Sequence, residues 1–401
     1  MYFNKLGIIC LICFFIQYQS FAQKKSQEIV TALNEFIKPI QTLKADSSFE
    51  DLDFLKEHLQ DKEVIALGEG THGTKEFFDY KDRLVRYLVS NLDYKAITFE
   101  SDYIAIEKID DYINGNSDQL IPLSGTALLF TNHKLIEWLK KYNLSQPVAK
   151  KVHLVGLEAR GFTNISAKIL AVIPQLSESE TAILERFKTI PYSNIKKDDL
   201  NLLLAAIETL KKKANSVLHQ HYINLLQQVA LGYYQKNIGF RDAYMAENAA
   251  WAKENAEGKK LIVWAHNGHV AKTALYNEPA MGKHLYERYT TKYFVIATDF
   301  NHGEVRVRKY LAKNKPLQDF SPLYYPEVDS EKAYEYYFKQ CKFKNFLIDV
   351  KTSSVHPILN TFFNRTLEMR MIGALSIPVN KKMAISENFD LIVFLNHTSS
   401  T

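Results

Sequence analysis

The sequence predicts an α/β fold in which a mainly parallel central sheet is flanked by helices and carries a large helical insertion. Short apolar runs alternate along the chain with amphipathic stretches of helical spacing. The runs are continuously apolar, which is typical of strands covered on both faces, as in a parallel sheet. The clearest predicted strands span residues 64–67, 96–99, 152–157, 261–265 and 294–297, with further ones at 304–308, 346–350 and 391–395.

The helical parts follow from the spacing of apolar residues and from the distribution of glycine. Residues 74–92 carry apolar side chains near helical spacing and predict the crossover helix after the first strand. No glycine occurs between Gly161 and Gly232, and apolar residues recur there at helical spacing. We therefore expect a helical insertion between two strands of the sheet, over about residues 164–258.

The start of the chain has the pattern of a secretory signal peptide. Lys5 supplies a positive charge, residues 6–16 are apolar, and a small-residue motif ends at Ala22. The apolar run is too short for a comfortable membrane span. We expect a signal peptide over residues 1–22 and one mature domain over 23–401 that is periplasmic or secreted, without stable membrane insertion.

Charge and cysteine content narrow the class of protein. The formal net charge is +5, but the basic residues are scattered and form no stripe interleaved with aromatic residues. This argues against a nucleic-acid partner. Once the predicted signal is removed, Cys341 is the only cysteine. An internal disulfide is therefore excluded, and stability has to come from the core.

The first predicted strand runs into a glycine-rich turn that holds Glu69 and His72. A histidine just before a helix tends to stay neutral and basic, and a nearby carboxylate fixes its tautomer. The pair therefore describes a general base, although a simple capping turn would also fit. The spacing Gly68-x-Gly70-x-x-Gly73 also matches a dinucleotide fingerprint. We reject that interpretation because Glu69 would repel a bound pyrophosphate.

A second motif, with His266 and His269, follows another predicted strand, and Glu100 ends a third. Ligands bind at the carboxyl ends of strands in open α/β sheets. We therefore expect one acid/base or metal site built from strand ends, with the side chains of Glu69, His72, Glu100, His266 and His269 gathered in one cleft. No Gly-x-Ser-x-Gly elbow is present, which favours water over serine as the nucleophile.

These motifs resemble the erythromycin esterase family in four blocks that occur in family order. The first block, Leu-Gly-Glu-x-x-His-Gly-x-x-Glu-Phe, is found at residues 67–77. Thr-Phe-Glu follows at 98–100, and Arg-Asp-x-x-Met-Ala-Glu-Asn at 241–248. The fourth block, with the two histidines, spans 265–270.

The resemblance implies a hydrolase that opens the lactone of macrolide antibiotics, confers macrolide resistance and needs no cofactor. His72 would be the base on a water molecule, and the two glutamates would orient the base and the water. His266 and His269 would stabilise the oxyanion or orient the substrate. Three further charged residues would contact the substrate: Glu76, Lys81 and Arg241. Lys81 stands where the family often has arginine, so it keeps the charge but lacks the bidentate fork.

Two alternatives remain at this point. In the first, Glu69, His72, Glu100 and one histidine of the second motif bind zinc or manganese in a metal-dependent hydrolase of another ester or amide. In the second, similar residues hold haem or another ligand without cleaving it, because the wider superfamily resembles haem-uptake lipoproteins.

Overall fold

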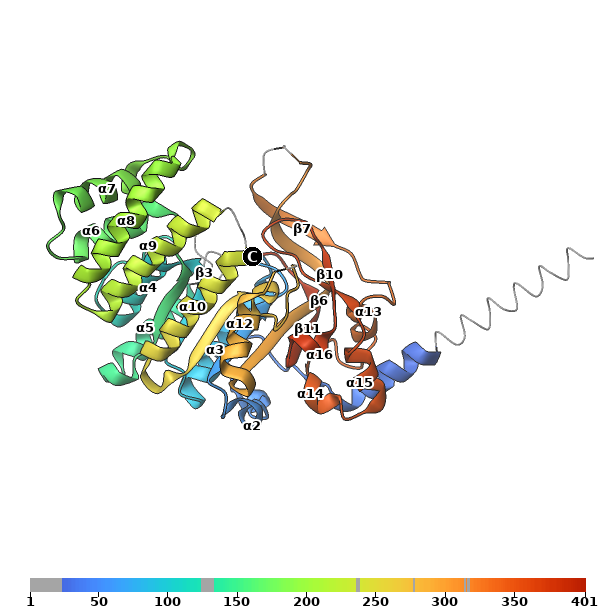
Figure 1. The fold of residues 1–401 in the computed structure, drawn as a ribbon. Helices are drawn as coiled ribbons and strands as arrows, with labels where there is room; N and C mark the ends of the chain where they lie inside the picture. The colour runs from blue at the N-terminus through green and yellow to red at the C-terminus, as the bar shows by residue number, and fades with distance from the viewer. Residues whose placement is uncertain (1–23, 124–132, 236–238, 277, 314, 316–317) are drawn as a thin grey trace, which may run out of the picture. The chain divides into compact units, whose positions relative to one another are not determined.

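The computed structural model describes residues 24–123, 133–235, 239–276, 278–313, 315 and 318–401 (Figure 1). The predicted signal peptide lies outside these residues. The chain divides into two compact units. The first unit comprises the described parts of Met1–Lys44, Glu69–Phe77 and Val295–Thr401, and the second comprises those of Ala45–Gly68 and Phe78–Phe294.

Four strands form the sheet of the second unit in the order β2-β5-β3-β4. Strand β3 pairs in parallel with both β5 and β4. Side chains of β2, β3 and β5 are buried along their whole length, as the continuous apolar runs predicted. The bounds are β2 (Val64–Glu69), β3 (Ala96–Asp102), β4 (His153–Glu158) and β5 (Leu261–His266).

Helices surround these strands, and the predicted crossover helix after the first strand is confirmed as α3 (Lys75–Asn91). Further helices of the second unit are α2 (Leu55–Leu59), α4 (Tyr103–Asn114), α5 (Lys134–Leu144), α11 (Asn267–Val270) and α12 (Met281–Tyr289). Short 3-10 turns are η1 (Glu50–Leu52), η2 (Val148–Lys150), η3 (Tyr192–Asn194), η4 (Glu257–Lys259) and η5 (Thr290–Lys292).

Five helices follow one another between β4 and β5, green to yellow in Figure 1. They are α6 (Phe162–Val172), α7 (Glu178–Thr189), α8 (Lys197–Lys213), α9 (Val217–Gln235) and α10 (Gly239–Asn255). Their inward faces form one apolar cluster with the start of α4, in which Ile165, Phe187, Leu203 and Leu226 are fully buried. Burial of these faces stabilises helices that would be marginal in isolation.

The first unit holds a mixed group of strands in the order β1-β8-β11-β6, with β7 paired to β6. Strand β11 runs parallel to β6, whereas the other pairs are antiparallel. The bounds are β1 (Lys38–Pro39), β6 (Tyr293–Arg308), β7 (Phe320–Tyr325), β8 (Asn345–Asp349), β9 (Leu367–Arg370), β10 (Asn380–Met383) and β11 (Leu391–Thr398). Helices α13 (Tyr334–Phe338), α14 (Val350–Ser353), α15 (Pro357–Phe363) and α16 (Ile385–Asn388) complete this unit.

Strand β6 differs from the prediction, which placed two separate strands at 294–297 and 304–308. The structure joins them through a polar stretch, 298–303, whose side chains are mostly buried. Asn301 in this stretch donates hydrogen bonds to Glu327 and Asn396, so its polar groups are satisfied inside the unit. Buried polar residues that are satisfied in this way hide a strand from a hydrophobicity pattern.

The strands form a mixed, mostly parallel central sheet flanked by helices, which confirms the predicted fold class. Over the part of the chain that the structure describes, no helix is both long and apolar enough to cross a bilayer. Cys341 is buried and unbridged.

Candidate active site

The turn that follows β2 is fixed by hydroxyl groups of the first unit. Gly70 donates its backbone N–H to Thr298 Oγ1 at 3.0 Å, and Gly73 donates its own to Thr71 Oγ1 at 3.1 Å. Thr71 is fully buried, so these bonds are shielded from water. They hold the backbone on both sides of His72 in one conformation.

Two glycines of the first motif are required by close packing rather than by unusual dihedral angles. A Cβ at Gly68 would lie 2.3 Å from Asn267 Oδ1, and one at Gly73 would lie 2.0 Å from the backbone oxygen of Arg306. Arg306 also donates its N–H to Gly73 O at 2.9 Å. The glycine spacing that resembled a dinucleotide fingerprint therefore serves tight packing of the chain.

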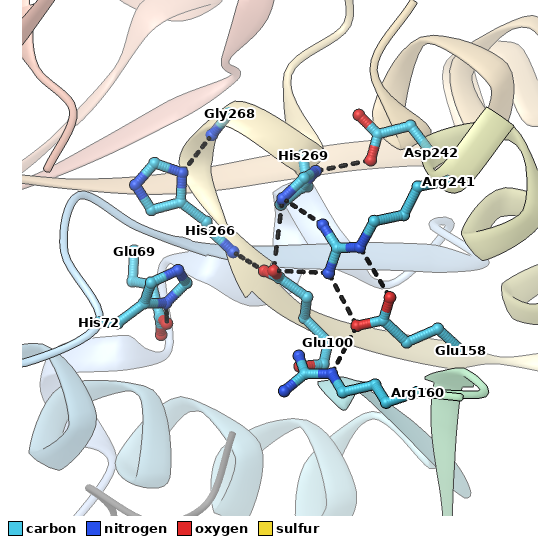
Figure 2. Close-up of polar contacts among 10 residues, drawn as sticks. All are labelled: Glu69, His72, Glu100, Glu158, Arg160, Arg241, Asp242, His266, Gly268 and His269. Carbon is cyan, nitrogen blue, oxygen red and sulfur yellow. Dashed lines mark hydrogen bonds and ion pairs between the residues drawn. The ribbon is translucent and has the colours of Figure 1, made fainter. Parts of the chain in front are cut away.

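Glu69 and His72 form a hydrogen-bonded pair within the first unit. His72 Nδ1 lies 2.8 Å from Glu69 Oε1 (Figure 2). The Glu69 side chain is 4% exposed and that of His72 is 25% exposed. A buried carboxylate that accepts from Nδ1 fixes the ring orientation and assigns the proton to Nδ1. The Nε2 atom is then the nitrogen that accepts a proton.

A β-bulge sets the direction of Glu100 at the end of β3. Phe99 pairs with Gly156, but the next paired residue, Asp102, faces Glu158, so β3 has one residue more than β4 in this interval. Bulges are common next to active sites, where they redirect a side chain. The backbone oxygen of Glu100 accepts a hydrogen bond from Arg160 Nη2 at 2.9 Å, which satisfies the bulged backbone.

The Glu100 carboxylate is the centre of a charged cluster in the second unit. Its Oε2 accepts the backbone N–H of His266 at 3.1 Å. Its Oε1 lies 3.1 Å from Arg241 Nη2 and 3.3 Å from His269 Nε2. Figure 2 shows the dashed contacts that converge on this carboxylate. The structure thus brings together four of the predicted residues, from β3, β5, α10 and α11.

Arg241 is clamped by Glu158, which ends β4. Its Nε and Nη2 lie 2.7 Å from the two carboxylate oxygens of Glu158, a bidentate geometry. Burial opposes the charge, but Glu158 and Glu100 outweigh it and raise the pKa of Arg241. Burial also opposes ionisation of Glu158, yet the hydrogen bonds and charge of Arg241 hold its pKa below the usual range. Both groups are therefore ionised at neutral pH.

His269 lies between two carboxylates, Glu100 at Nε2 and Asp242 at Nδ1, the latter at 2.6 Å. Burial would lower the pKa of His269, but Glu100 and Asp242 together raise it to about 10. The ring is then an imidazolium that donates to both carboxylates. Arg241 Nη1 also lies 3.1 Å from His269 Nε2. In the charged form of the ring, both of these nitrogens carry protons. The raised pKa of His269 favours the positively charged ring at neutral pH.

His266 makes different contacts from those of His269. Its Nδ1 accepts the backbone N–H of Gly268 at 3.2 Å, which caps the short helix α11. His266 as a whole is 4% exposed. Because Nδ1 accepts, the neutral ring carries its proton on Nε2. His266 can therefore donate a hydrogen bond through Nε2.

Two predicted substrate-binding residues have structural partners. Lys81 is fully buried, and its Nζ lies 4.2 Å from the centre of the Trp264 ring, a cation–π contact. Glu76 accepts the backbone N–H of Ser399 at 2.8 Å and also its hydroxyl. Glu76 thus holds the C-terminal segment, and its role toward a substrate stays a prediction.

The predicted residues fall into two groups, one in each unit. The Glu69–His72 pair belongs to the first, and the cluster around Glu100 belongs to the second. That both groups share one cleft stays a prediction. No group of three or more His, Cys, Asp or Glu side chains arranged to hold a metal ion is found among the described residues.

Sequence reasoning left Glu158, Asp242 and Arg160 out of the site. For two of these residues, the sequence does carry a signal. Glu158 ends a predicted strand, as Glu69 and Glu100 nearly do, and Asp242 adjoins Arg241 in the third motif. Arg160 has no such signal, because it is an isolated charge in a loop. Its bond to Glu158, 2.9 Å from Nε to Oε1, becomes visible only in three dimensions.

Comparison with known proteins places this geometry in a family. A family model described as erythromycin esterase matches residues 89–398. Erythromycin esterase type I of Escherichia coli is 23% identical over 397 residues, which covers 86% of this chain and 93% of that protein. Type II from the same organism is 23% identical and covers 59% and 67%, respectively.

Solved structures agree on the fold. A succinoglycan biosynthesis protein superposes with a TM-score of 0.82 at 23% identity, covering 94% of this chain and 98% of that one. An erythromycin esterase mutant, EreC, in its open conformation superposes with a TM-score of 0.66 at 20% identity, covering 90% and 98%. The family match spans most of the chain and indicates a hydrolase: this protein belongs to the erythromycin esterase family.

Proposed function

We propose that the protein hydrolyses a carboxylic ester with water that His72 activates, and that the ester is the lactone of a macrolide antibiotic. The observation that carries the proposal is the 2.8 Å bond between Glu69 and His72 Nδ1. It leaves Nε2 as the proton acceptor on a ring of fixed orientation. A positioned base of this kind contributes about 10²–10⁴-fold to a hydrolysis rate.

The proposed reaction begins with attack of the water oxygen on the carbonyl carbon while His72 Nε2 takes the proton. The tetrahedral oxyanion then collapses, the ring C–O bond breaks, and the departing oxygen recovers the proton from His72. The products are a carboxylic acid, which ionises by releasing its proton to solvent, and a hydroxyl group on one opened chain. Water is consumed and no other reactant is needed.

The cluster of the second unit would orient the group that stabilises the charge developing in this reaction. His266, with its proton on Nε2, supplies a neutral donor for the oxyanion. Glu100 holds that motif through the backbone N–H of His266. The three cations of the cluster are matched by three carboxylates, so we assign the cluster mainly to orientation. We further propose that Lys81 and Arg241 contact the substrate, as the family resemblance implies.

The test is hydrolysis of erythromycin by the purified protein, followed as a mass gain of one water. We expect His72→Asn to fold normally by circular dichroism and to lose about 10²–10⁴-fold in rate. Wild-type activity should survive exhaustive chelation. Loss on chelation with recovery on zinc or manganese would instead establish the metal-dependent alternative. Full activity in folded His72→Asn would remove His72 from the reaction.

A non-hydrolytic ligand binder is the second outcome of the same experiment. A protein that binds the macrolide or haem but releases unchanged ligand would contradict the esterase proposal. Intact mass of recovered ligand distinguishes binding from turnover in one measurement. Erythromycin resistance in cells that express the wild type but not His72→Asn would connect the activity to antibiotic resistance.

We also propose that the protein is exported to the periplasm or the medium. The support is the signal-like sequence before Gln23. Mass spectrometry of the protein recovered outside the cytoplasm should give a chain that starts near Gln23. An intact amino terminus on all of the protein would contradict export by cleavage.

A further inference from the structure

A cavity of about 460 Å³ opens in the second unit beside the clamp between Arg241 and Glu158. Cavities of this size are typical of small-molecule sites. Apart from Arg241, which also lines this cavity, the hydrolytic proposal assigns no role to its wall. Its wall is formed by the loop after β4, by η3 and by the facing sides of α9 and α10. The side chains that matter for its chemistry are Tyr192, Tyr233, Tyr244, Arg160 and Gln228.

Two tyrosines form a rigid aromatic corner of this cavity. The rings of Tyr192 and Tyr233 are 4.7 Å apart at 75°, an edge-to-face pair. Tyr233 also donates its hydroxyl to the backbone oxygen of Tyr192 at 3.0 Å. Phe162 supports both rings from behind, with each centroid 6.1 Å away. Tyr192 nevertheless remains 56% exposed, so part of its ring is available to a ligand.

The charged side chains on the polar side of the cavity are paired with one another. Glu158 pairs with both Arg160 and Arg241, and Arg241 also pairs with Glu100. An ionic ligand would have to compete with these existing pairs. Gln228 is oriented by reciprocal amide bonds with Asn248 at 2.9 and 3.1 Å. Gln228 Nε2 also donates to Glu247 Oε2 at 3.3 Å, so both of its N–H groups are engaged and its oxygen is the atom that can accept a further hydrogen bond. This oxygen and the Arg160 guanidinium suit a hydroxyl partner, which both donates and accepts.

Space for a ligand is left by a glycine in the wall. A Cβ built at Gly232, inside helix α9, would meet nothing within 4 Å. Glycine inside a helix costs about 0.5–1 kcal/mol relative to alanine. The open position therefore offers a way to fill the cavity by substitution without breaking an existing contact.

We propose that this cavity binds a neutral sugar ring carried by the ester substrate. A pyranose presents an apolar C–H face to an aromatic ring and hydroxyl groups at its edge. Those two surfaces match the tyrosine corner and the oriented Gln228 and Arg160 groups. The claim that the sugar is part of the ester substrate rests on the proposed ester hydrolysis. The claim that the cavity binds a sugar rests on the cavity itself.

Binding is tested with neutral methyl hexopyranosides by saturation-transfer NMR and titration. We expect millimolar binding by wild type and a loss of at least about ten-fold, or 1.4 kcal/mol, in Gly232→Leu. Tyr192→Ala should weaken binding in the same direction. Tyr286→Ala, an exposed tyrosine on α12, is the matched control and should bind as wild type does. Absence of binding, or equal binding by Gly232→Leu, would overturn the proposal. Preference for a uronic acid over the neutral glycoside would overturn the neutral assignment.

Rates of ester hydrolysis distinguish the sugar-binding proposal from the proposed esterase function. Two esters that differ only by one attached sugar are compared, and the ratio of their kcat/KM values is measured in wild type and Gly232→Leu. We expect that ratio to favour the glycosylated ester and to fall about ten-fold in the variant. Equal hydrolysis of both esters by wild type overturns the sugar subsite and leaves esterase activity intact. If the wild type hydrolyses neither ester but binds the glycoside, and Gly232→Leu abolishes that binding, the esterase proposal is refuted and the sugar-binding site is supported.

Discussion

Asp242 Oδ1 lies 2.6 Å from His269 Nδ1, and Glu100 approaches the opposite nitrogen of the same ring. The ring is thereby held as an imidazolium between two carboxylates. This arrangement orients the ring as a histidine–carboxylate pair does in many hydrolases. Its second carboxylate, however, removes the basic nitrogen. The relationship favours the charged form of His269 at neutral pH, in which the ring has no nitrogen left to take up a proton.

The first prediction concerns the protonation of His269. Asp242→Asn should lower the pKa of His269 from about 10 toward its ordinary 6.5, because one of two anionic partners is lost. Heteronuclear NMR of the labelled imidazole gives this pKa directly. His269 that is already neutral at pH 8 in the wild type would contradict the assignment.

The same pKa shift predicts how stability depends on pH. The folded-state pKa is raised, so the stabilisation is fully present below about pH 6.5 and is lost as pH rises toward 10. The difference in free energy of unfolding between wild type and His269→Gln should therefore be largest near pH 6 and shrink as the pH rises from 6.5 toward 10. Denaturant titrations at pH 6, 8 and 10 measure it. A difference that grows with pH would have the wrong sign.

The second prediction concerns the fork of Arg241. Arg241→Lys keeps the charge but cannot contact both oxygens of Glu158 and Glu100 together. Each charge-assisted hydrogen bond contributes about 1.5–3 kcal/mol, so we expect kcat/KM to fall at least about ten-fold. Arg186→Lys is the matched control, because Arg186 also contacts a carboxylate, that of Asp199, but lies outside the cluster around Glu100. An equal or larger loss for Arg186→Lys would contradict the central role of Arg241.

The sequence predicts those elements of the fold whose signal lies within one short segment of the chain. Apolar runs located β2, β3 and β5 because burial on both faces leaves a continuous pattern. The long strand β6 was missed as one element because polar residues such as Asn301 are satisfied by distant partners. Local patterns report burial, whereas they cannot report a hydrogen bond to a residue far along the chain.

The candidate active site is likewise predictable only where its signal is local in the sequence or follows from the strand order. The Glu69–His72 pair was predictable, because the two residues are three apart in one turn. The convergence of Glu100, His266 and His269 followed from the rule that parallel strands present their carboxyl ends at one edge. The charge state of His269 was not predictable from either signal. It depends on the contacts of the ring with Glu100 and Asp242, which only the folded chain shows.

The third prediction separates two roles for Glu76. Its carboxylate holds Ser399 by two hydrogen bonds. If that role dominates, Glu76→Ala lowers the free energy of unfolding by about 1–3 kcal/mol and leaves KM unchanged. If Glu76 contacts the substrate, KM rises while stability is preserved. Ser399→Ala is the control, because it removes one hydrogen bond to Glu76 without altering the carboxylate. Denaturant melts and steady-state kinetics on both variants give the answer.

The last prediction concerns a buried histidine among the helices between β4 and β5. The His221 ring stacks on Trp251 at 3.8 Å and 9°, and burial lowers the pKa of His221 to about 3. Because the folded form resists protonation, stability should be maintained above about pH 6.5 and fall progressively from pH 6.5 toward 3, where the unfolded chain takes up a proton that the folded chain does not. His221→Phe keeps an aromatic stack and removes the titrating nitrogen, so its free energy of unfolding should depend less on pH in that interval. His221→Leu should flatten the same slope but also lower stability at pH 7, since the stacking partner of Trp251 is lost. Denaturant titrations at pH 4, 5.5 and 7 distinguish the two effects, and an unchanged slope in both variants would show that His221 does not couple folding to acid.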